Sequence, residues 1–236
     1  MHYFPLALPV IFFFLFLFIA LIVLLEIQVL QYAYEKIGVD RRYVFALLLL
    51  SLLGSYINIP VYQLPPEEIR SGGTVFFYGV PYIIPMIAER PGTVIAVNLG
   101  GAIIPTFLSL YLMVKNRLYV PGLIGSALAA MIFHSMAHPV PGVGIAVPVL
   151  VPALVALAIG LLFSWNHAPA LAYIVGTLGT LIGADLTNLG KIAGLGAPVA
   201  SIGGAGTFDG IFLTGILAVL LAGLMGPRRT SPATKK

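Results

Sequence analysis

The sequence has 236 residues, of which 60% are hydrophobic and 8% are charged, whereas soluble domains have about 45–50% apolar and about 25% charged residues. The lack of cysteine excludes a disulfide framework and a cysteine metal site. The net charge of +4 comes from cations in short loops and in the tail, which is typical of membrane orientation and not of nucleic-acid binding. We therefore expect a protein of the lipid bilayer with no nucleic-acid partner.

Apolar runs of about 20 residues recur along the chain, and this length crosses about 30 Å of hydrocarbon. The predicted spans cover residues 5–27, 43–63, 97–115, 118–138, 143–164, 168–188 and 207–226. The fold class is predicted as an all-α integral membrane bundle of about seven transmembrane helices, forming one domain over residues 1–226. The basic tail at residues 227–236 is predicted to be disordered.

Residues 64–96 form the segment expected outside the membrane. Within it, Glu89-Arg90-Pro91-Gly92 has turn chemistry, and the stretch TVIAV after it favours extended backbone. We predict a small external β-hairpin or a re-entrant cap, because an isolated strand exposed to lipid would leave its backbone polar groups without partners.

Lysine and arginine are distributed unevenly between the two sides of the predicted bundle. If the chain crosses the membrane seven times, the polar loop after the first span, the other connections on that side and the C-terminal tail together carry nine of these residues. The connections on the other side carry Arg70, Arg90 and Lys191. The positive-inside rule then predicts a multi-pass cell-membrane protein with its N-terminus outside and its C-terminus in the cytoplasm. Closely spaced glycines in the sixth and seventh spans predict that these two helices pack against each other in the interior.

Polar residues from five spans fall at a similar depth once the direction of each span is set. They lie toward the outer face and are Asn58, Asn98, His134, His138, Asp185 and Asp209. The predicted orientation rests on the lysine and arginine counts alone. The similar depth of the six polar residues is therefore an independent observation. An acid beside a hydrophobic run is costly in lipid and needs a partner. We therefore expect a polar site near the outer face.

The residue types at this site suit two kinds of chemistry. His134 and His138 are four residues apart and share one face if both lie on a helix. With Asp185 and Asp209 they would form a ligand set for a divalent metal such as Zn²⁺. The two aspartates could instead share one proton and act as catalytic residues that activate water. A membrane-embedded hydrolase is therefore the first functional hypothesis.

The motifs of intramembrane aspartyl proteases fit the sequence poorly. Those enzymes carry a G-x-G-D motif, and Gly183-Ala184-Asp185 lacks its second glycine. They also carry Pro-Ala-Leu, which occurs here at residues 152–154 and 169–171, before both acids and not after them. The hydrolase hypothesis therefore rests on the acids themselves.

Two other functions remain open. A cation or proton-coupled transporter or channel would use the same acids, and the Gly-rich junction at residues 189–206 suits a transport site. The scarcity of ionisable residues in the inner halves of the later spans counts against a proton relay. A structural or partner-binding subunit, or a homo-oligomer, would use Asn58 and Asn98 only as hydrogen bonds between helices.

Two further residues are predicted to support the polar cluster. Asn188 lies three positions after Asp185, and Thr207 is a candidate N-cap for the last span. In a purely structural protein, Asp209 would sit in the first turn after that cap and interact with the helix dipole.

Several long motifs carry a resemblance. GTLGTLIGADLTNL and SIGGAGTFDGIFLTGILAVLLAG, with LLGSYINIPV and VIAVNLGGAIIP before them, resemble an uncharacterised family of prokaryotic multi-pass membrane proteins, a domain of unknown function. The resemblance covers about residues 45–225. It implies a helical membrane protein and supplies no catalytic, binding or cofactor residue.

Overall fold

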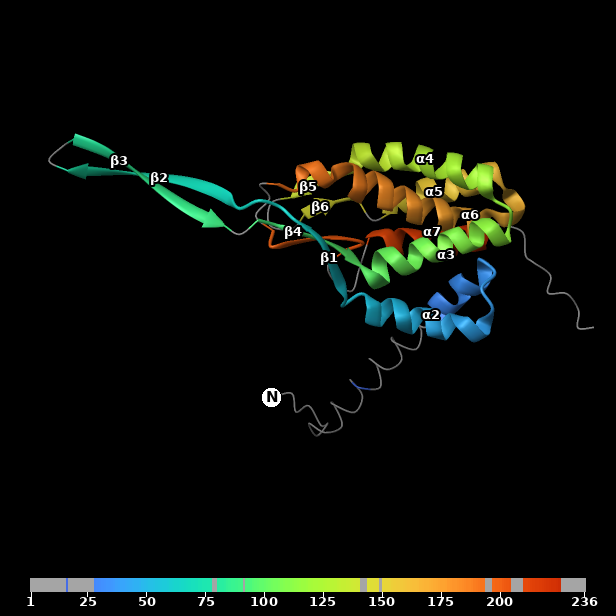
Figure 1. Cartoon of the computed structure of the whole chain (residues 1–236). Helices are drawn as coiled ribbons and strands as arrows, with labels where there is room; N and C mark the ends of the chain where they lie inside the picture. The colour runs from blue at the N-terminus through green and yellow to red at the C-terminus, as the bar shows by residue number, and fades with distance from the viewer. Residues whose placement is uncertain are drawn as a thin grey trace, which may run out of the picture.

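Helices form the body of the protein. The computed structural model describes residues 16, 28–77, 80–90, 92–140, 144–148, 150–193, 197–204 and 210–225. Its main helices are α2 (Arg41–Gly54), α3 (Ile104–Lys115), α4 (Tyr119–Met136), α5 (Leu150–Phe163), α6 (Ala168–Thr180) and α7 (Gly210–Met225). Helices α3 to α7 run side by side as a bundle, as Figure 1 shows.

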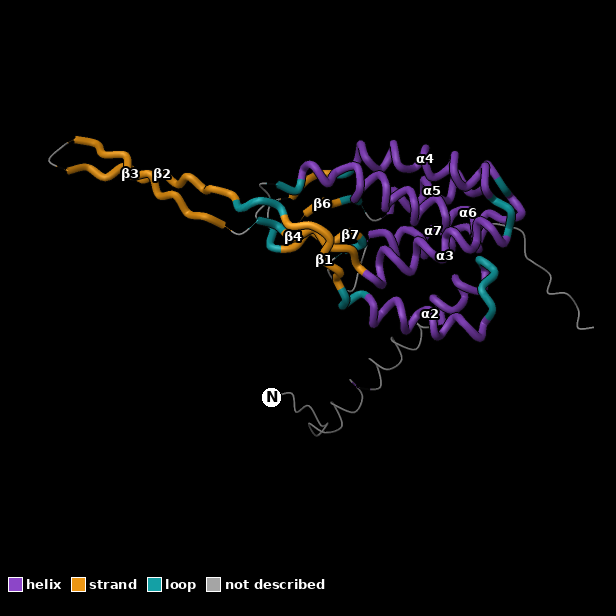
Figure 2. Tube along the Cα trace, viewed as in Figure 1, coloured by secondary structure: helices purple, strands orange, loops and turns teal. Residues whose placement is uncertain are grey.

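The strands form three small sheets. β1 (Asn58–Gln63) pairs antiparallel with β4 (Val94–Asn98), which pairs parallel with β7 (Val199–Ile202). β2 (Glu67–Phe77) and β3 (Val80–Arg90) form a hairpin, and β5 (His138–Val140) pairs with β6 (Gly144–Ala146). These strands gather where α2, α4 and α6 end (Figure 2). We call this the strand end of the bundle, and the end where α3 and α5 finish the opposite end.

The predicted helical character is confirmed, but the chain is not all-α, because the connections at one end pair as strands. Two described helices are long and apolar enough to cross a membrane, Tyr119–Met136 and Trp165–Lys191, and the other apolar helices in the described ranges are shorter. The number of seven spans therefore stays a prediction. The span expected at residues 5–27 lies, apart from Phe16, outside the described residues.

The prediction for residues 28–63 was wrong in two places. The expected polar loop is helical at residues 28–36, and it buries Ala33 and Tyr34 in the core. The expected second span stops at Gly54 and continues as β1. Pro60 supplies no backbone donor for a helix, and the segment pairs with β4 from Asn58 to Gln63.

The β-hairpin predicted within residues 64–96 is confirmed, with its turn in a different place. Glu67 pairs with Arg90 and Phe77 with Val80. Glu89 and Arg90 of the predicted turn therefore belong to the base of the hairpin and not to its tip. The hairpin projects away from the bundle in Figure 1 and does not cap it. The extended stretch predicted after it is β4.

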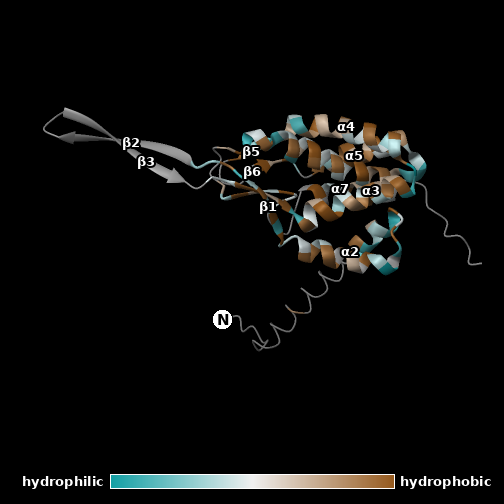
Figure 3. Ribbon diagram, viewed as in Figure 1, coloured by the Kyte–Doolittle hydropathy of each residue, from teal (hydrophilic) through white to brown (hydrophobic). Residues whose placement is uncertain are grey.

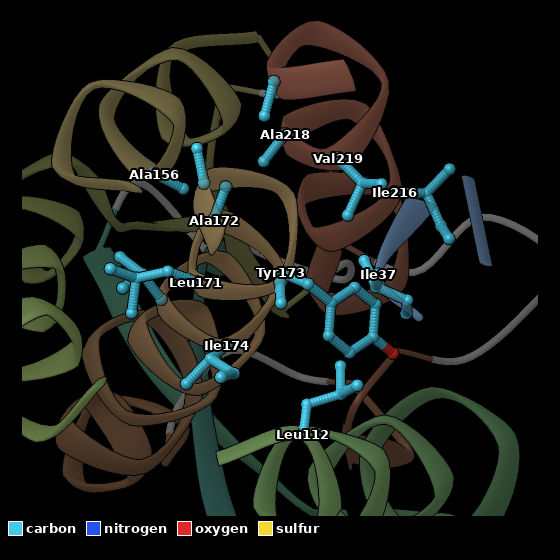
Figure 4. Close-up of a cluster of buried hydrophobic side chains, with 14 of the residues drawn as sticks. Ile37, Leu112, Ala156, Leu171, Ala172, Tyr173, Ile174, Ile216, Ala218 and Val219 are labelled. Carbon is cyan, nitrogen blue, oxygen red and sulfur yellow. The ribbon is translucent and has the colours of Figure 1, made fainter. Parts of the chain in front are cut away.

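Helix α6 lies at the centre of the core. It contacts α3, α4, α5 and α7, and Figure 4 shows Leu171, Tyr173 and Ile174 surrounded by apolar side chains of its neighbours. The predicted close packing of the sixth and seventh spans is confirmed, since a Cβ added at Gly215 of α7 would lie 2.7 Å from Thr177 Oγ1. Small residues at this contact let the two backbones approach.

Candidate functional site at the strand end

The strand end is built around an irregular continuation of α6. After Thr180 the chain forms a π-helical turn, η3 (Leu181–Asp185), and then a 3₁₀ segment, η4 (Leu186–Lys191). Such breaks in α-helices are frequent at functional sites. Gly183 is required inside the break, because a Cβ there would overlap the carbonyl oxygen of Ala130 on α4.

His134, near the end of α4, contacts this break. Its Nδ1 lies 2.8 Å from Thr187 Oγ1, and the Thr187 hydroxyl donates to the carbonyl oxygen of Gly183 at 2.8 Å. A hydroxyl group has one proton, so in this arrangement His134 donates its Nδ1 proton to Thr187. Its Nε2 is then the acceptor nitrogen of the exposed ring.

Asn188 has an incomplete set of hydrogen bonds. Its Nδ2 donates to the carbonyl oxygens of Gly183 at 3.0 Å and Ala184 at 2.9 Å. These bonds fix the orientation of the amide, since the reversed amide would place its oxygen against two carbonyls. Asn188 is fully buried, yet its Oδ1 has no hydrogen-bond partner among the described residues. Buried acceptors normally have a partner, so this oxygen is suited to accept from a ligand or a water molecule.

Asp185 closes the π-helical turn and joins it to the turn that follows β7. Its Oδ2 accepts a hydrogen bond from the backbone N–H of Gly203 at 2.9 Å. Gly203 has φ +88°, and a Cβ there would lie 2.6 Å from both N and Cβ of Ala102. Only glycine fits this position without strain.

A second π-helical turn, η1 (Leu99–Ile103), lies on the other side of Gly203. The side chain of Asn98 caps it. Its Oδ1 accepts from Gly101 N–H at 2.8 Å, and its Nδ2 donates to Ser55 O at 2.7 Å and to Asn58 Oδ1 at 3.0 Å. The two polar clusters are therefore connected through Gly203.

A comparison with known families covers both clusters. Residues 52–221 match the family described as "Protein of unknown function (DUF1614)". The chain belongs to this family. No curated protein and no solved structure matches it. The predicted resemblance to a family of unknown function is confirmed, while the prokaryotic and membrane character of the DUF1614 family stays a prediction.

The structure of this DUF1614 protein brings several predicted residues together. Asn58 bonds to Asn98, and Asn188 Nδ2 lies 3.4 Å from His134 Nδ1. Asp185 joins the two groups through Gly203. Their roles in catalysis, binding or support stay predictions.

The placement of His138 was predicted incorrectly. Helix α4 ends at Met136, and Ala137 is extended, with φ −80° and ψ 121°. His138 therefore lies on β5 and not one helical turn beyond His134. The physical reason is Pro139, which disfavours helical backbone at the residue before it.

The predicted metal set is only partly represented. Asp209 and the supporting residue Thr207 lie outside the described residues. Within the described ranges, no three His, Cys, Asp or Glu side chains are grouped as metal ligands need to be. The Zn²⁺ site and the aspartate pair therefore stay predictions, and no chemistry is derived through them.

Some polar residues that the structure brings forward were not selected from the sequence. Thr187 and Ser201 complete the hydrogen bonds of His134 and Asn58, with Ser201 Oγ donating to Asn58 Oδ1 at 2.6 Å. Tyr173 and Thr177 are buried in the core, on the part of α6 that precedes the break. Their spacing of four residues within a predicted span was the available signal, because it places both hydroxyl groups on one helix face.

Proposed function

We propose that this DUF1614 protein is a multi-pass membrane protein that conducts protons through the polar site at its strand end. The observation that carries the proposal is the break of α6 at Asp185, beside His134 and the unpartnered Oδ1 of Asn188. Broken helices with ionisable side chains are typical of ion and proton sites in membrane transport proteins.

The outer surface of the bundle supports a place in the lipid bilayer. Large apolar side chains are exposed along α2 to α5, among them Leu53, Phe107, Leu123, Ile124, Met131 and Leu154. Figure 3 shows hydrophobic residues covering these helices. Soluble monomers rarely expose apolar patches above a few hundred Å², whereas lipid would cover such a surface.

Aromatic and basic residues at the opposite end support the orientation. Lys36 lies 5.1 Å from the ring centroid of Tyr32, and Lys115 lies 5.4 Å from that of Tyr111. Lys115 Nζ also donates to Gly38 O at 2.6 Å, so the first two predicted cytoplasmic connections meet. Tyrosine with lysine is typical of the membrane interface, and an excess of lysine and arginine is typical of its cytoplasmic side. This supports the strand end as the outer end.

The groups at the break suit a proton better than a metal ion. Carboxylate, imidazole and hydroxyl groups all carry or relay protons, and they are present in Asp185, His134 and Thr187. A metal ion would need several strong ligands, whereas the hydrogen-bond partners of Asp185 and His134 are a backbone N–H and a hydroxyl group. Hydrolysis is the second candidate function. It would use Asp185 together with Asp209, which is the only other acidic residue between residues 92 and 225 of the sequence.

The test is proton flux into proteoliposomes that contain the full chain and an internal pH-sensitive dye. An imposed potassium diffusion potential drives proton entry, and the rate is compared between wild type and Asp185→Asn. The amide of the variant still accepts the hydrogen bond from Gly203 but cannot exchange a proton. We expect its flux to fall at least about tenfold, the effect of losing a specific proton-transfer group.

Asp40→Asn is the matched control. Asp40 is exposed at the opposite end, where its Oδ1 accepts from Arg42 N–H at 3.0 Å at the start of α2. The same chemical change there should leave the flux at the wild-type rate. Wild-type flux no faster than in protein-free liposomes, or undiminished flux in Asp185→Asn, would overturn the proposal.

A further inference from the structure

Helix α6 carries a row of hydroxyl groups through the middle of the core. Tyr173, Thr177 and Thr180 are spaced by four and then three residues, so their side chains follow one face of the helix. Tyr173 and Thr177 are 0% exposed and Thr180 is 3% exposed. Thr180 is the last residue of α6, and the π-helical turn that ends with Asp185 follows directly.

The row continues toward the opposite end through Tyr34. This residue belongs to the helical segment at residues 28–36 and is almost fully buried, and its hydroxyl lies beside that of Tyr173. Tyr173 in turn lies beside Thr177. The row therefore joins two segments far apart in the sequence, and it begins in the helical segment that also carries Tyr32 and Lys36.

Most hydroxyls in a protein core are hydrogen-bonded, but two in this row are not. Thr180 Oγ1 donates to Gly176 O at 2.7 Å. By contrast, Tyr173 Oη and Thr177 Oγ1 are buried, and although Tyr173 faces both Tyr34 and Thr177, neither atom makes a hydrogen bond of regular geometry in the part of the chain that the structure describes. Figure 4 shows Tyr173 between Ile37 and Leu112, in otherwise apolar surroundings. Unpaired buried hydroxyls are costly unless a further donor or acceptor joins them.

We infer that Tyr34, Tyr173, Thr177 and Thr180 form a hydrogen-bonded path, completed by water, that carries protons between Asp185 and the opposite end. The inference rests on the proposed function, proton conduction, and names the route that the protons take through the core. Hydroxyl groups both donate and accept, so a row of them can relay a proton without a permanently ionised side chain in the core. The scarcity of ionisable residues in this part of the sequence therefore does not exclude proton movement.

The other face of α6 provides a contrast. Val175 lies about 200° around the helix from Tyr173, and a Cβ at Gly125 of α4 would lie 2.8 Å from its Cγ2. Ser126 follows Gly125 on α4, and its Oγ is also buried without a partner among the described atoms. Ser126 is therefore a buried, unpaired hydroxyl on a helix other than those that carry the row.

The experiment measures proton flux in the proteoliposome assay for Tyr173→Phe, Thr177→Val, Thr177→Ser and Ser126→Ala. Tyr173→Phe and Thr177→Val keep the side-chain shape and remove the hydroxyl group. We expect each to lower the flux about tenfold, the factor that corresponds to one lost hydrogen bond along the path. Thr177→Ser should retain the wild-type flux because it keeps the hydroxyl. Ser126→Ala should also retain it. Thermal unfolding of each variant in detergent verifies that the fold is intact.

The outcomes separate the path from the proposed function. Loss of flux in Tyr173→Phe and Thr177→Val, with normal flux in Thr177→Ser and Ser126→Ala, supports the path. Normal flux in Tyr173→Phe and Thr177→Val, with flux lost in Asp185→Asn, overturns the path and leaves the proposed function standing. An equal loss in Ser126→Ala also overturns the path, because removing any buried hydroxyl would then have the same effect. No wild-type flux above protein-free liposomes overturns the proposed function itself.

Discussion

The two π-helical turns of the strand end differ in how completely their asparagines are bonded. Asn98, before η1, uses both its oxygen and its nitrogen, in hydrogen bonds to Gly101, Ser55 and Asn58. Asn188, after η3, uses only its nitrogen, and its buried oxygen has no partner in the described ranges. The same local irregularity thus serves packing in η1, whereas after η3 it leaves a buried acceptor without a partner, three residues after Asp185.

The contact between the two turns offers the largest expected effect. Gly203→Ala places a Cβ 2.6 Å from Ala102 and imposes φ +88° on a non-glycine residue. Backbone strain and overpacking each cost about 1–3 kcal/mol, so we expect the free energy of unfolding to fall by about 3 kcal/mol or more. Denaturant titration of the purified protein in detergent measures it.

Gly190→Ala is the control for this substitution. Gly190 lies in η4, is exposed, and has no described atom within 4 Å of a Cβ added there. Its substitution should change the free energy of unfolding by no more than about 0.5 kcal/mol. Equal effects of the two glycine substitutions would mean that η1 and η3 do not meet at Gly203.

The two asparagines should differ by a smaller amount. Asn98→Ala leaves the buried N–H of Gly101 in η1 without its acceptor and removes the hydrogen bonds to Ser55 O and Asn58 Oδ1, and we expect a loss of about 2–3 kcal/mol in the free energy of unfolding. Asn188→Ala should cost only about 1 kcal/mol, since it also removes an unpaired buried oxygen. Gly183 O would still accept from Thr187 in that variant. The same denaturant titration compares them. A loss in Asn188→Ala as large as that in Asn98→Ala would indicate that both turns are purely structural.

Much of the helical body could be predicted from the sequence. The spans expected at 97–115, 118–138 and 207–226 contain α3, α4 and α7, because runs of apolar residues determine where such helices form. The paired strands at the strand end could not be predicted in the same way. β4 pairs with residues 58–63 on one side and with residues 199–202 on the other, and such distant pairing leaves no local pattern.

The residue types of the candidate site could be predicted from the sequence, whereas its hydrogen bonds could not. Asn98, His134 and Asp185 were predicted as site residues from their depth within the predicted spans. All three lie at the strand end. The π-helical turns have no sequence period of their own, so the bond from Asp185 to Gly203 could not be anticipated. The row at Tyr173 was missed because tyrosine and threonine in an apolar span resemble ordinary core residues.

The most direct test of the account asks whether α4 faces lipid while α6 is enclosed. The sequence has no cysteine, so spin labels can be placed on single-cysteine variants in liposomes. Suitable positions are Leu123 on α4, which is 64% exposed, Ile174 on α6, which is 0% exposed, and Asn166, which is exposed in the short 3₁₀ helix between α5 and α6. Power saturation measures access to oxygen, which concentrates in lipid, and to a water-soluble nickel chelate. We predict high oxygen access at Leu123, low access to both reagents at Ile174, and high nickel access at Asn166. A Leu123 label as accessible to nickel as the label at Asn166 would contradict the membrane-embedded bundle.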